Sequence, residues 1–183
     1  GDRERGFWLI ELMLVVPIIG IVSGIAIAMT SNLLKTSKAD SALAMALGAI
    51  EDARDRAVTE RRNFQMDFVA PNRIRVSRVE VPGPNKTLVS ETILENGQIF
   101  KQLPAGVPDT DDKFGAQKDV NFTGTLPVMF TSDGTLIDAS GDVVNGSIFL
   151  AHNANRDSVR AITILGVTGL IRTWKRSGTK WLE

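Results

Sequence analysis

The C-terminal tail holds the densest cluster of residues that could bind a charged partner. Two tryptophans are interleaved there with four cations, Arg172, Lys175, Arg176 and Lys180. Cations contact phosphates and aromatic rings stack on bases, so this pattern suits single-stranded nucleic acid. The whole chain is neutral, however, with 21 lysines and arginines against 21 acidic residues, and it offers no wider basic surface. We therefore favour the alternative, a final strand with a solvated basic face and tryptophans covering the sheet edge.

The other residue types that could do chemistry are sparse. The single histidine, His152, has no cysteine to share a zinc ion with, so we expect an exposed loop histidine. Asp109, Asp111 and Asp112 lack the alternating ligands of a calcium loop, which favours a solvated acidic loop. No nucleophile–base pair or phosphate loop is evident. The sequence predicts no enzyme, no metal, no cofactor and no small-molecule substrate.

The first 30 residues contain a long apolar segment. No charge occurs from Leu12 to Met29, and the apolar character extends back to Phe7. About 20 such residues form a helix that crosses a bilayer. An amphipathic pattern follows without a small-residue cleavage site, so we expect residues 7–30 to stay attached as a membrane anchor.

Glu11 is the charged residue within this apolar segment. A carboxylate in hydrocarbon is costly unless it is paired. It could lie at the headgroup boundary, where the cost is small. Alternatively, it forms an ion pair with a cation that another subunit supplies. If the chain were cut after Gly6, the new α-amino group of Phe7 in a neighbouring chain would be the natural partner, and the pair would fix axial register.

The helical pattern continues through residues 31–62. Apolar residues recur there at spacings of three and four, and Leu47 and Val58 widen the stripe that they form: Ala39, Leu43, Ala46, Ile50, Ala53 and Ala57. This predicts one nearly continuous helix from Phe7 to about Arg61. The stripe lacks the sustained leucine or isoleucine of a coiled-coil seam, so we expect it to dock on a domain.

Residues 63–183 change to short β-like runs separated by turns. The pattern predicts an α+β fold, with the long helix packed on a small antiparallel β-sandwich. Asp133-Gly134 indicates a hairpin, and Pro104–Lys118 an irregular exposed loop. The predicted strands are Phe64–Val69, Arg73–Val81, Thr87–Leu94, Gln98–Gln102, Val120–Phe122, Val128–Thr131, Thr135–Asp138, Ser147–Leu150, Arg160–Leu165 and Leu170–Lys175.

The run Arg5-Gly6-Phe7-Trp8-Leu9-Ile10-Glu11-Leu12-Met13 resembles the type IV prepilin signature. The resemblance implies a leader over residues 1–6 and cleavage between Gly6 and Phe7 by a prepilin peptidase. It also implies N-methylation of Phe7 and a register-setting role for Glu11. Two residues depart from the family pattern. Trp8 replaces a small polar residue, and Pro17 falls early in the anchor, where it removes a helix hydrogen bond.

Three further motifs resemble the GspH/FimT pseudopilin domain: Ala53–Ala57, Phe130–Thr135, and Arg160–Ile164 with Thr168–Arg172. The resemblance implies a minor subunit of a type II secretion pseudopilus or type IV pilus. Such a subunit is anchored by a single span in the bacterial inner membrane, with its domain outside the cytoplasm, and its partners are other subunits and the peptidase. Some FimT-type pilins bind DNA through an arginine motif, but Leu170 replaces its first arginine here. A DNA-binding minor pilin is the alternative, and a bitopic membrane protein that never assembles is a weaker one.

Overall fold

The structure is a computed structural model that describes the backbone of residues 3–83, 85–95, 97–152 and 158–183. Within the helix, the side chains of residues 3–9 and 26–33 are not described. The chain divides into two compact units, Gly1–Ser37 and Lys38–Glu183. Each unit is described by itself below.

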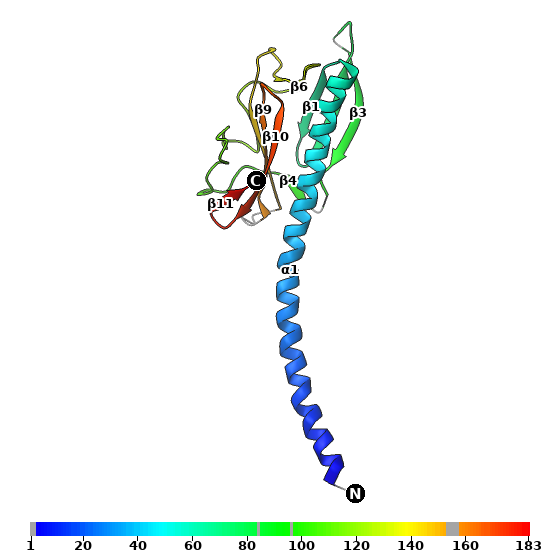
Figure 1. Cartoon of the computed structure of the whole chain (residues 1–183), viewed down its shortest axis with the longest axis vertical. Coiled ribbons are helices and arrows are strands. Elements are labelled where there is room, and N and C mark those ends of the chain that lie inside the picture. The colour runs from blue at the N-terminus through cyan, green and yellow to red at the C-terminus, as the bar shows by residue number, and fades with distance from the viewer. Residues whose placement is uncertain (1–2, 84, 96, 153–157) are drawn as a thin grey trace. The chain divides into compact units, whose positions relative to one another are not determined.

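One helix, α1 (Arg3–Glu60), runs continuously through Pro17 and provides all the regular structure of the first unit (Figure 1). The prediction of a single long helix is confirmed. Every side chain from residue 10 to residue 25 is exposed. Among the side chains that the structure describes, no helical stretch is long and apolar enough to cross a membrane. Residues 7–9 and 26–30 of the predicted anchor lie outside those described side chains.

The second unit contains two antiparallel sheets (Figure 1). The first has the order β3-β2-β1-β6-β7, and the second has the order β11-β10-β9-β8-β4, with β5 also paired to β8. The strands of the first sheet are β1 (Phe64–Val69), β2 (Arg73–Val79), β3 (Lys86–Ile93), β6 (Val128–Phe130) and β7 (Leu136–Ile137). Those of the second are β4 (Gln98–Phe100), β5 (Val120–Phe122), β8 (Gly146–His152), β9 (Arg160–Leu165), β10 (Leu170–Ser177) and β11 (Lys180–Leu182).

The apolar stripe of α1 shares one core with both sheets. All six residues of the predicted stripe are buried. Five of them, from Leu43 to Ala57, join a cluster that includes Phe64 and Met66 of β1 and Ile148 and Ile162 of the second sheet. The α+β fold, with a helix packed on antiparallel strands, is therefore as predicted. One detail is wrong: Leu47 packs against this core, but Val58 remains 45% exposed.

A second apolar cluster lies on the other face of the second sheet. It contains Phe149, Trp174 and Trp181, and it is covered by Leu103 and Val107 from the irregular segment before β5. The indole N–H of Trp181 donates a hydrogen bond to the Pro108 carbonyl at 3.0 Å. The segment 104–118 is thus irregular as expected, but it is not simply exposed, because part of it covers the tryptophans.

Each of the ten predicted strands overlaps one of β1–β10. Three have the predicted bounds, and the ends of the others differ by at most two residues. The Asp133-Gly134 hairpin joins β6 to β7. The short strand β11 was not predicted. It pairs with the end of β10 through a turn at Gly178, whose φ of 62° suits glycine.

Candidate functional site

The exposed part of α1 is apolar on every side. Side chains of isoleucine, leucine, valine and methionine between Ile10 and Ile25 are 44–74% exposed. A helix that is hydrophobic all round is normally buried, in lipid or among other helices. This surface therefore lacks the partner that its composition requires.

Glu11 is exposed among these apolar side chains. Gly6 and Phe7 lie in α1, but their side chains are outside the part that the structure describes. The structure thus places Glu11 four residues, or about one helical turn, after Phe7. Cleavage, methylation and register setting remain predictions.

The four candidate DNA-binding cations do not share one face of the second sheet. Side chains alternate along a strand, so Arg172 and Arg176 lie on the face of the buried Trp174, and Lys175 lies on the opposite face. Lys180 is opposite Ser177 in the register of β10 and β11, which places it on the Lys175 face. A single strip of four cations is therefore not formed.

Carboxylates already hold two of these cations. An Arg172 N–H donates to Asp112 at 2.8 Å, and Glu183 lies 3.5 Å from the same guanidinium. The Lys175 ammonium is 3.5 Å from Asp40. Arg176 donates to the Gly178 carbonyl at 2.9 Å. For Lys180, the described residues provide no ion pair.

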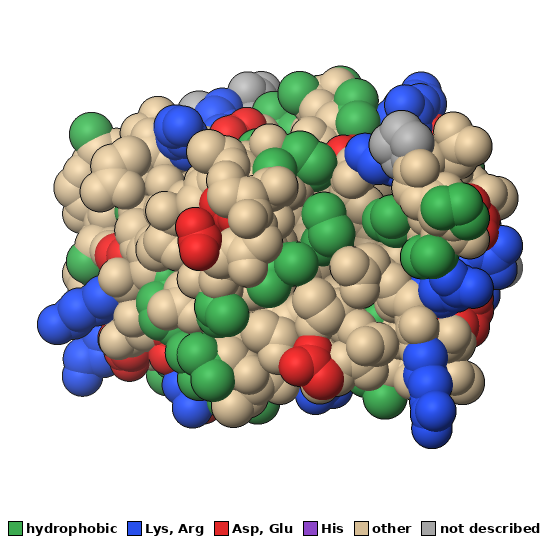
Figure 2. Space-filling view, turned by 90° about the horizontal axis from the view of Figure 1, so that it is seen from above, with side chains coloured by type: hydrophobic (Ala, Val, Ile, Leu, Met, Phe, Trp, Pro, Cys, Tyr) green, Lys and Arg blue, Asp and Glu red, His purple; other side chains and the backbone are tan. Residues whose placement is uncertain are grey.

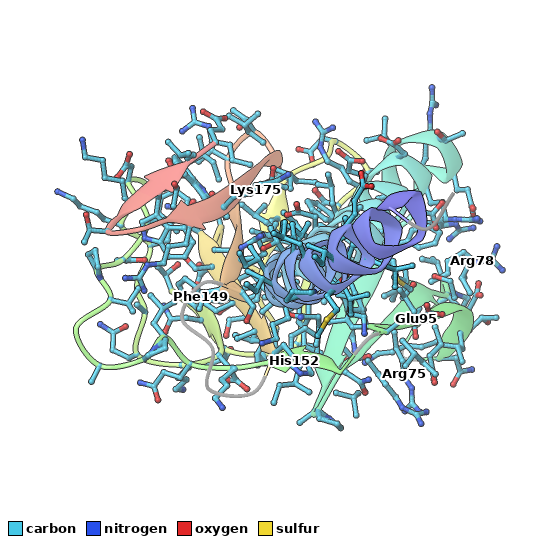
Figure 3. The ribbon with its side chains drawn as sticks, turned by 90° about the horizontal axis from the view of Figure 1, so that it is seen from below. Arg75, Arg78, Glu95, Phe149, His152 and Lys175 are labelled. Carbon is cyan, nitrogen blue, oxygen red and sulfur yellow. The ribbon has the colours of Figure 1, made fainter. Side chains whose placement is uncertain are left out.

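Asp40 has a second partner, the buried Arg160 of β9. The two side chains are 2.8 Å apart, and Arg160 is only 2% exposed. A buried guanidinium needs such a partner, so this pair ties α1 to the second sheet. Figure 3 shows Lys175 on the opposite side of the view from Arg75 and Arg78. These three basic side chains therefore do not form one patch.

Of the residues weighed for metal binding, Asp109, Asp112 and His152 make hydrogen bonds within the domain, and Asp111 is exposed. Asp109 accepts hydrogen bonds from the backbone N–H groups of Thr110 and Gly115. Asp112 also accepts one from the Thr163 hydroxyl, which in turn accepts from the Trp174 indole. His152 is exposed at the end of β8, not in a loop, with Nδ1 3.0 Å from the Gly97 carbonyl oxygen. The described residues contain no group of three metal-ligating side chains.

Three sequence motifs meet at Arg54. A guanidinium N–H donates to the Thr168 carbonyl at 3.2 Å. A side chain at Gly169 would overlap the Gly134 carbonyl oxygen and approach Arg54 Nε to 2.6 Å, so only glycine fits there. Sequence reasoning noted each motif separately but not this junction. The local signal in the sequence was the glycine at positions 134 and 169. Gly134 and Gly169 have φ values of 84° and 62°.

Asp138 forms a second junction that the sequence did not indicate. This residue is 5% exposed, and its carboxylate accepts backbone hydrogen bonds from Thr125, Ser140 and Asp142. The Thr125 N–H, followed by those of Asp142 and Ser140, lowers the pKa of Asp138. The carboxylate thus holds the turn after β7 against the segment before β6.

No family model matches the sequence, and no curated protein does. Among solved structures, the type IV minor pilin FimU of Pseudomonas aeruginosa is 15% identical, with a TM-score of 0.48 over 85% of this chain and 97% of that one. The minor pseudopilin EpsH of the Type 2 Secretion System of Vibrio cholerae is 10% identical, with a TM-score of 0.46 over 74% and 96%. The chain is similar to these proteins. At such identities the likeness concerns the fold.

Proposed function

We propose that the chain is a minor pilin or pseudopilin, a structural subunit of a type IV pilus or of a type II secretion pseudopilus. It is made as a precursor, cut between Gly6 and Phe7, and held in the inner membrane until it joins a filament. The observation that carries this proposal is the apolar, exposed surface of α1 between residues 10 and 25. The sequence pattern around Gly6, Phe7 and Glu11 supports it.

Burial of that surface would drive both insertion and assembly. Burying one valine, leucine or isoleucine side chain contributes about 1.5–3 kcal/mol, and many such side chains are exposed here. The domain itself does not need this surface, because the buried stripe begins at Ala39 and completes a core with the two sheets. The apolar segment is therefore available to contact lipid or other subunits.

Glu11 would supply the specificity that apolar burial lacks. Apolar helices can slide past one another at little cost, whereas a carboxylate in low dielectric must meet a cation. In the proposed mechanism, that cation is the methylated α-amino group of Phe7 in the neighbouring subunit. One ion pair per subunit then selects one axial register.

DNA capture is not proposed as the main function. Arg172 and Lys175 already contact carboxylates, and the four cations lie on two faces of the sheet. A phosphate would have to compete with Asp112 for Arg172. The role proposed is structural rather than catalytic.

Leader processing tests the proposal directly. The full chain is co-expressed with a prepilin peptidase, and the intact mass of the membrane fraction is measured. We expect loss of the residues up to Gly6 and a gain of one methyl group on Phe7. Gly6→Leu should leave the precursor uncut, because a bulky side chain blocks approach to the peptide bond, whereas Gly6→Ala should be cut at least partly. An uncut chain with Gly6 present would overturn the proposal.

A further inference from the structure

Strand β1 lies in the middle of the first sheet, yet one of its two sides is paired over only half of its length. All six residues of β1, from Phe64 to Val69, pair with β2. On the other side, β6 pairs only with residues 64–66, because β6 begins at Val128, which is opposite Met66. Among the strands that the structure describes, none covers this second side of residues 67–69.

Phe68 is the residue whose backbone faces this open side. In an antiparallel sheet, the N–H and C=O of one residue point to the same side, and the side alternates from residue to residue. The Val79 N–H donates to the Asn63 carbonyl at 2.8 Å, so residue 63 and every second residue after it face β2. Residues 64, 66 and 68 face the opposite side, where β6 pairs with the first two of them. In the described parts of the chain, the Phe68 N–H and C=O are left without a strand to pair with.

A hollow lies at this open side of β1. Its volume is about 430 Å³, and it is lined by residues 66–69, Arg75, Leu126 and Pro127. We call it the edge hollow. Its size falls within the ~300–1,000 Å³ of ordinary binding pockets. Figure 3 shows Arg75 at the margin of the second unit, away from α1, which places this wall of the edge hollow on the outside of the molecule.

The backbone at the edge hollow is held in place. The Phe68 ring packs edge-on against Phe100 and lies at the same centroid distance, 5.8 Å, from Phe122. These ring contacts fix the Phe68 backbone from the side of the core. Leu126, which is 54% exposed, and Val69 provide an apolar wall. A site that is fixed in this way loses little ordering entropy when a ligand fills it.

The charged residues of the edge hollow are held by neighbours within the domain. Asp67 and Arg75 are opposite each other in the register of β1 and β2, and their charges cancel. The Gln65 amide donates to the Asp67 carboxylate at 2.8 Å, and the Arg75 guanidinium donates to Glu91 at 2.7 Å. Figure 2 likewise shows acidic side chains among the lysines and arginines of the face seen from above, not a surface of one sign. Backbone hydrogen bonds and apolar contact, rather than charge, therefore select the ligand.

The free backbone groups specify a peptide. One donor and one acceptor on the same side of an extended residue are complementary to the N–H and C=O of a residue in an antiparallel strand. Peptides bind the exposed edges of sheets in this way, with affinity from main-chain hydrogen bonds and specificity from side-chain pockets. The residues that flank the one opposite Phe68 lie opposite Asp67 and Val69, on the face of the Val69 side chain. An apolar side chain opposite Val69 then completes the apolar wall.

The apolar segments that the structure describes are not free extended strands. The exposed run between Ile10 and Ile25 is helical, and the apolar strands are paired within the two sheets. A second copy would have to release a strand from its own core. We propose that the edge hollow binds an extended, uncharged apolar segment of a different protein, which adds to β1 as a short antiparallel strand. This inference goes beyond the proposed function and does not depend on it, because the site lies wholly within the second unit.

Binding can be measured with short peptides and the full-length chain in mild detergent. The probes have the form threonine–X–alanine–X–threonine with both ends blocked, where each X is valine, isoleucine, leucine or phenylalanine. Titration gives the affinity, and hydrogen exchange followed by NMR identifies the amide that becomes protected. We expect several of these peptides to bind. The Phe68 amide should exchange more slowly in the complex, because its N–H then donates to the peptide.

Modified peptides and variants make the test specific. A methyl group on the nitrogen of the central alanine removes the donor that meets the Phe68 carbonyl, so it should abolish binding. The same methyl group on a flanking residue, whose N–H faces away from β1, should leave most of the binding. Leu126→Asp should lower the affinity by about tenfold or more, because it removes an apolar contact. Leu88→Asp is the matched control: Leu88 is 55% exposed on β3, outside the edge hollow, so this variant should bind as the parent does.

Three outcomes would overturn the inference: no binding by any of the peptides at about 1 mM, equal binding by the peptide methylated at alanine, or no protection of the Phe68 amide. Protection of that amide when the concentration of the chain alone is raised would show that a second copy fills the edge hollow, and it would also overturn the inference. None of these outcomes changes leader processing at Gly6, so the inference and the proposed function can fail separately.

Discussion

Gly169 and Gly178 have the same backbone φ of 62° but different surroundings. A Cβ atom at Gly178 would meet nothing within 4 Å, whereas one at Gly169 would overlap the Gly134 carbonyl oxygen. The two residues therefore separate the cost of a left-handed conformation from the cost of a crowded site. At the residue scale, this comparison tests whether the junction at Arg54 holds the domain together.

We expect Gly178→Ala to lower the free energy of unfolding by about 1–2 kcal/mol, the cost of placing a side chain in the left-handed region. Gly169→Ala should lower it by roughly 1–3 kcal/mol more, because the turn must also move away from Gly134 and Arg54. Urea unfolding of both full-length variants, followed by circular dichroism, measures the difference. Equal losses would mean that the junction tolerates movement.

The Arg54 junction shows why the sequence could not predict a site of this kind. Arg54 and Thr168 are 114 positions apart, and each belongs to a motif that is weak when taken alone. Periodicity reports which face of a helix is buried, but it does not report which turn that face meets. Asp138 was missed for the same reason, because its partners Thr125 and Asp142 come from two different turns.

At the scale of elements, prediction succeeded where one physical signal extends over many residues. The stripe from Ala39 to Ala57 repeats over several turns, and it is buried throughout. Prediction from sequence failed for β11, whose three residues are too few to show alternation, and for the segment 104–118. That segment has polar composition, yet Thr110 is fully buried, and Val107 and Ala116 pack against the cluster that contains the tryptophans.

The N-terminal helix provides the prediction at this scale. Glu11→Ala removes the carboxylate from an apolar surface, so insertion of the full chain should be equal or better. Assembly should be impaired, because the Phe7 amine of the neighbour would have no partner. The readout is the share of the chain recovered with sheared filaments, relative to its amount in membranes. Glu11→Asp keeps the charge and should retain part of the recovery.

Equal recovery of the Glu11→Ala variant and the parent would contradict the register role. Glu11 would then be an interfacial residue at the headgroup boundary. The proposal of a filament subunit would still stand on apolar burial alone. Loss of the chain from membranes would instead show that Glu11 acts before assembly.

At the scale of the whole molecule, several carboxylates have a lower pKa in the fold than in the unfolded chain. The Thr87 hydroxyl and then Arg78 lower the pKa of Glu80, and Arg75 lowers that of Glu91. The Thr131 hydroxyl lowers the pKa of Asp133, and the Thr125 N–H lowers that of Asp138. All four lie in the first sheet or in the segments next to its strands, so acid should weaken this part of the domain.

The direction of the pH dependence follows from linkage. A carboxylate with a lowered pKa in the folded state binds protons more readily when the chain unfolds, so it stabilises the fold at neutral pH. This stabilisation is complete above the ordinary carboxyl pKa of about 4 and is lost as the pH falls through the lowered value. We therefore expect the full-length chain to have a lower urea midpoint at pH 3 than at pH 7.

Asp138 should contribute strongly to that loss, because it is the least exposed of the four and its carboxylate accepts three backbone hydrogen bonds. Asp138→Asn removes the charge but keeps the shape of the side chain. The variant should therefore have a lower urea midpoint than the parent at pH 7, and its midpoint should fall less between pH 7 and pH 3. Asp111→Asn, at an exposed position, should follow the parent at both pH values. If Asp138→Asn and the parent lose the same amount on acidification, the acid sensitivity of the domain does not arise at this junction, and the ion pairs of β2 and β3 become the groups to test.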